Sequence, residues 1–187
     1  EDDEEWSEIQ DMQWFKDAQK WASADEYFHW KLEFPEVYYT TDGQNRESPG
    51  FDAVIGNPPY VRQELITSFK DYLQKEFSVY HGRADIYAYF VEQATELARN
   101  QGRLSYILSH KFTKVKSGKG LRKLVADHQI EEFIDFQDLP VFGPDVSAYP
   151  AIMILSKNPP SKPFKYAQID DLDFNSLPDR VERVKKE

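Results

Sequence analysis

The stretch FDAVIGNPPYV, residues 51–61, constrains the fold of this chain more than any other. Its first part is a short apolar run that has the length and composition of a buried β-strand and ends at Gly56. Four residues follow it: Asn57, Pro58, Pro59 and Tyr60. Because proline fixes φ and has no N–H group, the strand must stop here and continue as a stiff turn. The carbonyl groups of such a turn remain available as hydrogen-bond acceptors.

After this turn the sequence alternates between apolar runs typical of strands and helical patterns. The further predicted strands are 103–110, 130–136 and 151–157, and the predicted helices are 84–102 and 117–129, the second starting near Gly120. Short β-branched runs between helices predict an α/β sheet with a parallel interior. No GxGxxG or GxxxxGK[ST] turn is present. We therefore predict the α/β class, as part of a doubly wound sheet of about four strands with flanking helices.

The ends of the first predicted helix carry residues that suit caps. Asp85 fits the N-cap position and Gly102 fits the C′ position. Ile86, Phe90 and Ala94 share one face of this helix. The helix would then span the full segment between the first two strands.

The N-terminal part of the chain has a different composition. Residues 1–36 contain twelve acidic side chains and three lysines, and 6–30 are helix-permissive with a tryptophan-rich stripe typical of a packing face. The polar loop TTDGQNRESPG, 40–50, is the clearest internal boundary. We predict an acidic helical segment over 1–50 and a second domain over 51–187.

Composition narrows the classes of site and location. The chain has no cysteine, its four histidines lack ligand spacing, and no apolar run approaches the length of a membrane span. The opening EDDEEW also differs from a basic, then apolar, signal peptide. We expect no metal site, no membrane association and a cytoplasmic location.

Charge is unevenly distributed along the chain. The formal net charge is -10, yet no acidic residue occurs between Leu97 and Ala126, where arginines and lysines accumulate. A basic run of this kind is either a solvated helix face or a surface that contacts nucleic acid. The high overall acidity is also compatible with a salty cytoplasm.

The residues after the first strand carry acceptors beside an aromatic ring. Ligands of open α/β sheets bind at the carboxyl ends of strands, which is where this turn lies. The side chain of Asn57 and the carbonyl of Pro58 offer two acceptors, and Tyr60 offers a flat face. This arrangement suits a planar ring with an exocyclic amino group. The alternative is a plain loop that ends the strand.

These segments also carry a resemblance. GNPPYV resembles the catalytic motif of gamma-class N6-adenine DNA methyltransferases, especially those fused into type IIG restriction–modification enzymes. ADIYAYFVEQATEL, GRLSYILSHKF and VFGPDVSAYPAIMIL resemble later segments of that family, in the same order. The resemblance covers roughly residues 28–157 and identifies 51–187 as the C-terminal half of a methyltransferase catalytic domain.

The resemblance implies a reaction and a set of residue roles. A methyl group would pass from S-adenosylmethionine to N6 of an adenine that is rotated out of the duplex. Asn57 and Pro58 would accept the amino hydrogens, Tyr60 would stack on the base, and Phe142 would contact it from another side. Phe90 matches the aromatic on the cofactor side, with an ordinary core position as its alternative. The basic run would contact the DNA backbone through Lys111, Lys114, Lys116, Lys119 and Arg122.

Two features depart from the family pattern. The glycine-containing S-adenosylmethionine motif is not found, and SHK at 109–111 stands where the family has PNK. We therefore expect a fragment whose S-adenosylmethionine site is incomplete. Its partners would be double-stranded DNA and the remainder of the parent polypeptide, with a cofactor motif upstream and a target-recognition domain downstream. The alternatives are a protein-glutamine N5 methyltransferase, which also uses NPPY, and a non-catalytic α/β binding module.

Overall fold

The chain divides into two compact units, Glu1–Arg46 and Glu47–Glu187, which are described separately. The structure is a computed structural model, and it describes residues 2–25, 28–61, 67–143 and 148–173.

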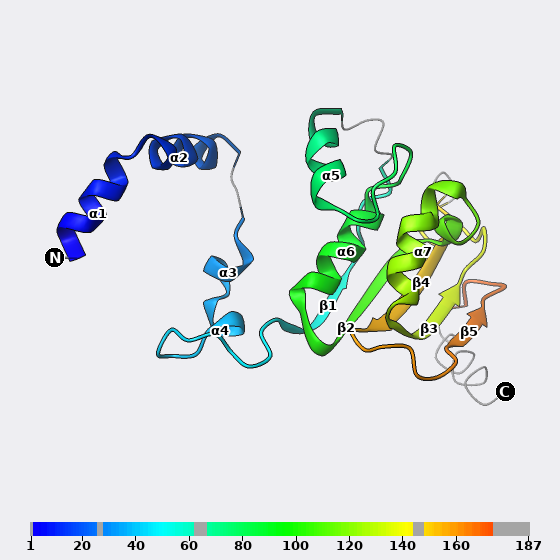
Figure 1. The fold of residues 1–187 in the computed structure, drawn as a ribbon. Helices are drawn as coiled ribbons and strands as arrows, with labels where there is room; N and C mark the ends of the chain where they lie inside the picture. The colour runs from blue at the N-terminus through cyan, green and yellow to red at the C-terminus, as the bar shows by residue number, and fades with distance from the viewer. Residues whose placement is uncertain (1, 26–27, 62–66, 144–147, 174–187) are drawn as a thin grey trace. The chain divides into compact units, whose positions relative to one another are not determined.

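The first unit is helical, as its composition predicts. Its elements are α1 (Asp2–Asp11), α2 (Gln13–Asp25), α3 (Trp30–Glu33) and α4 (Pro35–Tyr38), as labelled in Figure 1. The expected packing stripe is only partly buried, because Trp14 is 61% exposed whereas Ile9 and Phe15 are half-buried. The side chains of Trp6 and Trp21, which belong to the same stripe, lie outside the described part of the structure.

The second unit is built on one five-stranded sheet (Figure 1). Its strands are β1 (Phe51–Gly56), β2 (Ala98–Ser109), β3 (Gln129–Asp135), β4 (Pro150–Ser156) and β5 (Lys165–Gln168), in the spatial order β1-β2-β4-β3-β5. β1 pairs with β2 and β3 pairs with β5 in parallel, whereas β4 is antiparallel to both of its neighbours. The carboxyl ends of four strands therefore share one edge of the sheet, and β4 begins at that edge.

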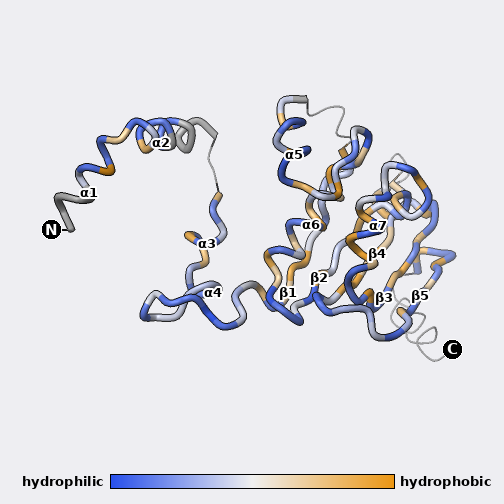
Figure 2. Tube along the Cα trace, viewed as in Figure 1, coloured by the Kyte–Doolittle hydropathy of each residue, from blue (hydrophilic) through white to orange (hydrophobic). Residues whose placement is uncertain are grey.

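All four predicted strands are present, and two features of the sheet differ from the expectation. The parallel interior is wrong for β4, because an apolar run such as PAIMILS has the same composition in either direction. Figure 2 shows β4 as a largely hydrophobic strand, as expected for a central position. The fifth strand, β5, was not predicted, since it has four residues, three of them exposed, and follows a proline-rich segment.

Two helices cover one face of this sheet. α6 (Tyr87–Leu97) packs against β1 and β2, and α7 (Lys119–Ala126) packs against β3. Their apolar side chains join those of the strands in one buried cluster that includes Val91, Leu104, Leu121, Met153 and Leu155. The remaining helical elements are η2 (Thr67–Phe69), α5 (Lys70–Glu76), η3 (His110–Thr113) and η4 (Lys116–Gly118).

The predicted caps of the first helix are wrong. α6 ends at Leu97, because Ala98 already pairs with Phe51 in the sheet. A Cβ atom on Gly102 would lie 2.8 Å from the carbonyl oxygen of Phe51, so this glycine permits close approach of β1 and β2 instead of ending a helix. At the other end the N-cap is Ile86, without a side-chain capping bond, and not Asp85.

Candidate functional site

The NPPY segment lies at the carboxyl end of β1, where the chain leaves the sheet. Asn57 and Pro59 are exposed, whereas Pro58 is buried. The preceding Gly56 packs closely on β2, since a Cβ atom there would lie 2.9 Å from Cε1 of Tyr106. The far end of the segment is also held, because the N–H of Ile86 donates to the carbonyl of Val61 at 2.8 Å. The motif is thus fixed at both ends by backbone and packing contacts.

The structure brings together two residues that lie 82 positions apart, as their numbers show: Tyr60 and Phe142. Their ring centroids are 5.7 Å apart at an interplanar angle of 60°, and the ring of Tyr87 lies 6.2 Å from that of Tyr60. The hydroxyl of Tyr60 is buried and has no hydrogen-bond partner among the described residues. Burial raises the pKa of Tyr60 from 10.0 to about 12.

Phe90 is not a core residue, because 44% of its surface is exposed. It lines a groove of about 500 Å³ between α5 and α6 that is almost entirely apolar. The other lining residues are Phe69, Tyr72, Leu73, Phe77, Ile86, Tyr89 and Gln93. Flat aromatic walls of this kind fit a purine ring. Among the described residues of the lining, none carries a charged side chain that could pair with the amino-acid end of S-adenosylmethionine.

The predicted DNA-contacting residues differ in their exposure and in their contacts. Four of them are exposed on the connection after β2 and at the start of α7: Lys111, Lys114, Lys116 and Lys119. Nζ of Lys111 lies 4.1 Å from the ring centroid of Tyr149, a cation–π contact. Arg122 is half-buried instead, and its Nη1 donates to the carbonyls of Phe112 at 2.5 Å and Val115 at 2.8 Å. Arg122 therefore stabilises the backbone between Phe112 and Val115, which lies among the exposed lysines.

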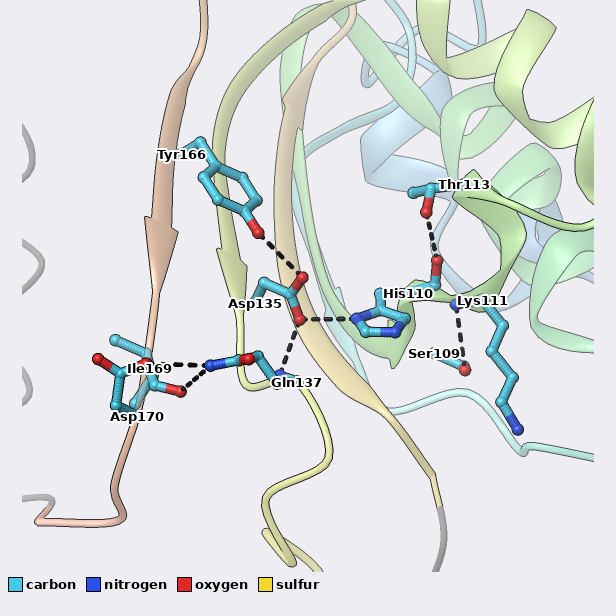
Figure 3. Close-up of polar contacts among 9 residues, drawn as sticks. All are labelled: Ser109, His110, Lys111, Thr113, Asp135, Gln137, Tyr166, Ile169 and Asp170. Carbon is cyan, nitrogen blue, oxygen red and sulfur yellow. Dashed lines mark hydrogen bonds and ion pairs between the residues drawn. The ribbon is translucent and has the colours of Figure 1, made fainter.

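A polar cluster that the sequence did not reveal lies at the same edge of the sheet (Figure 3). Nδ1 of His110, just after β2, lies 2.7 Å from Oδ1 of Asp135, the last residue of β3. That carboxylate also accepts from the backbone N–H of Gln137 at 2.8 Å and from the hydroxyl of Tyr166 at 3.0 Å. Burial raises the pKa of Asp135, but the hydrogen bonds from His110 and Gln137 outweigh it, so the net pKa is lowered. The usable signal was the position of both residues at carboxyl ends of strands.

Within 2–25, 28–61, 67–143 and 148–173, no group of three or more histidine, aspartate or glutamate side chains is placed to hold a metal ion. No helix in the described ranges is long and apolar enough to cross a membrane.

Curated relatives match a little over half of the chain. The type II methyltransferase M.BstVI of Geobacillus stearothermophilus is 42% identical over 112 residues, covering 58% of this chain and 20% of the relative. The type II restriction enzyme and methyltransferase RM.Eco57I of Escherichia coli is 30% identical over 112 residues, covering 57% of this chain and 11% of the relative. The matched part thus spans about a fifth or less of the length of these relatives.

Solved structures share the fold at low sequence identity. A Listeria monocytogenes protein assigned to the class I S-adenosylmethionine-dependent methyltransferases has a TM-score of 0.56 at 17% identity, covering 75% of this chain and 45% of its own. The type IIG restriction endonuclease BpuSI has a TM-score of 0.52 at 18% identity, covering 71% of this chain and 17% of its own. The second unit therefore has the Rossmann-like fold of S-adenosylmethionine-dependent methyltransferases.

The family comparison agrees with the NPPY segment and the fold. The family model described as Eco57I restriction-modification methylase matches residues 1–142, which is most of the chain and includes both the N-terminal unit and the motif. The chain belongs to the Eco57I restriction-modification methylase family.

Proposed function

We propose that this chain is part of a site-specific DNA methyltransferase of a restriction–modification system, which methylates adenine at N6. The observation that carries the proposal is the NPPY segment at the carboxyl end of β1, with Phe142 in contact with Tyr60. Two acceptors beside an aromatic face fit an aromatic amine, and such an amine is accessible only when the base leaves the duplex.

Each residue of the segment has a distinct role in this proposal. The exposed amide of Asn57 and the carbonyl of Pro58 accept the two hydrogens of the amino group. These bonds hold the nitrogen lone pair out of conjugation with the ring and direct it toward the methyl donor. Pro58 and Pro59 keep the acceptors in place, because neither residue can rotate about φ. The rate then derives from orientation and preorganised dipoles, without a titrating base, and the methylated nitrogen releases its extra proton to water.

The aromatic pair has to open to admit a base. A base stacked between two parallel rings needs centroids roughly 7 Å apart, twice a carbon–carbon contact of about 3.5 Å. Tyr60 and Phe142 are 5.7 Å apart and already touch. The flipped base therefore displaces one ring, stacks on Tyr60 and meets Phe142 at its edge. Contact between the two rings protects this apolar surface from water until DNA arrives.

The groove at Phe90 fits one part of S-adenosylmethionine. The cofactor supplies the methyl group when bound. Its adenine ring matches the aromatic walls, whereas its amino-acid end finds no charged partner among the described lining residues. We infer that Phe90 contacts the adenine and that other parts of the polypeptide hold the rest. The chain by itself should then show no micromolar affinity for S-adenosylmethionine in calorimetry.

The remainder of a longer polypeptide completes the enzyme in this proposal. Its cofactor motif lies upstream and its target-recognition domain lies downstream of the present residues. Support comes from the length of the relatives and from β1, an edge strand whose Ile55 is 80% exposed. Large apolar residues on an uncovered strand commonly mark a surface that another element covers. Double-stranded DNA is the substrate, and the exposed lysines after β2 contact its backbone.

The experiment that tests the function is methylation by the complete enzyme that carries this chain. It should transfer labelled methyl groups from S-adenosylmethionine to duplex DNA, and nuclease digestion should release N6-methyladenine. A glutamine-containing protein substrate serves as the second acceptor in the same assay. Label in N5-methylglutamine without label in DNA would overturn the proposal in favour of protein methylation.

A further inference from the structure

A polar hollow of about 390 Å³ lies beside the His110–Asp135 pair. It is lined by residues of β3 and β5 and of the segments that follow β2 and β3 or precede β4, among them His110, Lys114, Asp135, Tyr149 and Tyr166. Because η3 follows β2 directly and Asp135 ends β3, the hollow opens at the same edge of the sheet as the NPPY segment. The roles proposed for the NPPY segment make no use of it.

Asp135 orients the imidazole of His110 and is not available as a free anion. Its two carboxylate oxygens accept from three donors: Nδ1 of His110, the N–H of Gln137 and the hydroxyl of Tyr166 (Figure 3). The side chains of His110 and Asp135 are each only 14% exposed, so the pair has little freedom to rearrange. With Nδ1 on Asp135, Nε2 is the ring nitrogen left for a ligand.

The cations of the lining suit an oxyanion. A protonated imidazole donates from both nitrogens, so His110 can keep its bond to Asp135 while Nε2 donates to a ligand oxygen. Lys114 adds an exposed ammonium group to the same hollow. A bound phosphate would then contact the imidazolium of His110 and the ammonium of Lys114. Negative and positive groups would thus alternate from Asp135 through His110 and the phosphate to Lys114. Asp138, the other acid among the described lining residues, is exposed, so solvent screens its charge.

We propose that this hollow holds one backbone phosphate of the DNA substrate, with His110 and Lys114 as its ligands and Asp135 as the residue that positions His110. This inference rests on the proposed function and adds to it one contact that fixes the position of the DNA strand on the protein. A single phosphate held beside a buried, oriented ring locates the strand relative to Tyr60 and Asn57. Phosphate contacts fix the orientation of a duplex on a protein, whereas the charge of the exposed lysines adds sequence-independent, salt-dependent affinity.

A phosphate scan of the complete enzyme tests the proposal. Each phosphate around the target adenine is replaced in turn by a neutral methylphosphonate, and the Kd for the duplex is measured. The wild-type enzyme should lose about tenfold in affinity at one phosphate, the effect of one charge-assisted hydrogen bond. His110→Gln and Lys114→Ala should lose about tenfold on unmodified DNA and should no longer discriminate at that phosphate. Their kinetic defect should fall on KM for the duplex.

Matched control substitutions lie at the other end of the sheet, where the amino ends of the parallel strands lie. His128→Gln and Lys162→Ala lie near the amino end of β3 and should retain the wild-type scan. Asp135→Asn should lose discrimination at the same phosphate as His110→Gln, an effect that a general loss of stability would not produce.

The outcomes separate this inference from the proposed function. If the wild-type enzyme methylates adenine but His110→Gln keeps wild-type discrimination at every phosphate, the subsite is wrong and the function stands. If the wild-type enzyme binds and methylates no DNA, both are wrong.

Discussion

Asn57 and Pro58 are neighbours in the chain but differ in exposure, since the asparagine is exposed and the proline is buried. The buried ring anchors the turn, and the amide beside it remains accessible to a substrate. A substitution at Asn57 should therefore affect chemistry without affecting folding.

Asn57→Ala in the complete enzyme should lower kcat about 10²–10³-fold, by analogy with the removal of one preorganised donor, about 2.7–4 kcal/mol of barrier. The melting temperature should stay within error, because an exposed side chain is removed. Single-turnover methylation of duplex DNA measures the rate. Asn100→Ala, an exposed asparagine on β2, is the matched control and should retain full activity. Methylation by Asn57→Ala at the parental rate would exclude the acceptor role.

The hydroxyl of Tyr60 has a different expected role from its ring. It is buried without a partner among the described residues, so it destabilises the fold relative to a plain phenyl group. Tyr60→Phe should raise the free energy of unfolding by up to about 1 kcal/mol and keep activity, whereas Tyr60→Ala should lose base stacking and activity. Chemical denaturation and methylation assays measure the two effects.

The same hydroxyl gives a pH signature. Burial raises the pKa of Tyr60 to about 12 in the folded state, whereas an unperturbed tyrosine has a pKa of 10.0. Titration of this phenol therefore leaves the free energy of unfolding unchanged below about pH 10 and lowers it as pH rises toward about 12. The stability gained by Tyr60→Phe should grow over this alkaline window. An equal gain at all pH values would show that the hydroxyl is solvated.

At the scale of single elements, α6 holds the segment that connects α5 to α6. Its buried Glu92 accepts from the backbone N–H groups of Ser78 at 2.9 Å and Val79 at 3.0 Å. Val79 is fully buried and touches Gly120 at the start of α7. The carboxylate of Glu92 therefore fixes the Ser78–Val79 segment to α6, and this segment in turn contacts the start of α7.

Glu92→Ala should lower the free energy of unfolding by about 2–3 kcal/mol, because the buried N–H of Val79 and the partly buried N–H of Ser78 lose a charged acceptor. Glu96→Ala, an exposed acid one turn further along α6, should change it by less than about 0.5 kcal/mol. Urea denaturation of both variants gives the comparison. Equal values for the two would contradict the tie between helices and loop.

The sequence predicted which segments form helices and strands better than it predicted where these elements end and in which direction a strand runs. Apolar runs of four to eight residues specify a strand, but they contain no information on whether β4 runs parallel or antiparallel. The helix pattern through Gly102 was local, whereas the pairing of Ala98 with Phe51 that ends α6 is a tertiary contact. β5 is too short and too exposed to stand out from a loop.

The candidate site was predictable where a contiguous motif carries it. NPPY is read directly from the sequence, and the proximity of Phe142 to Tyr60 followed from the resemblance. The pairing of His110 with Asp135 was not, because 25 residues and a strand separate them. Arg122 looked like one more exposed cation, and only the three-dimensional structure shows its bonds to two backbone carbonyls.

At the scale of the whole molecule, β1 leaves one side of the sheet unpaired in the described residues. The side chains of Ala53 and Ile55 point to the same face of the strand, and both are exposed. The helices that contact the sheet pack on the opposite face, where Val54 joins the main core. In the proposed complete enzyme, additional polypeptide covers the face that carries Ile55.

The substitution Ile55→Lys should have different effects on the stability of this chain and of the complete enzyme. In the chain as printed, Ile55 is 80% exposed, so the lysine should change the free energy of unfolding by less than about 0.5 kcal/mol and should improve solubility. In the complete enzyme the same lysine would be forced against apolar surface, which should cost about 2 kcal/mol or more and lower the melting temperature. Gln74→Lys, on the exposed face of α5, is the control that should be neutral in both. Because the two proteins share this strand, an equal and small effect of Ile55→Lys in both would mean that no additional polypeptide covers the face of β1 that carries Ile55.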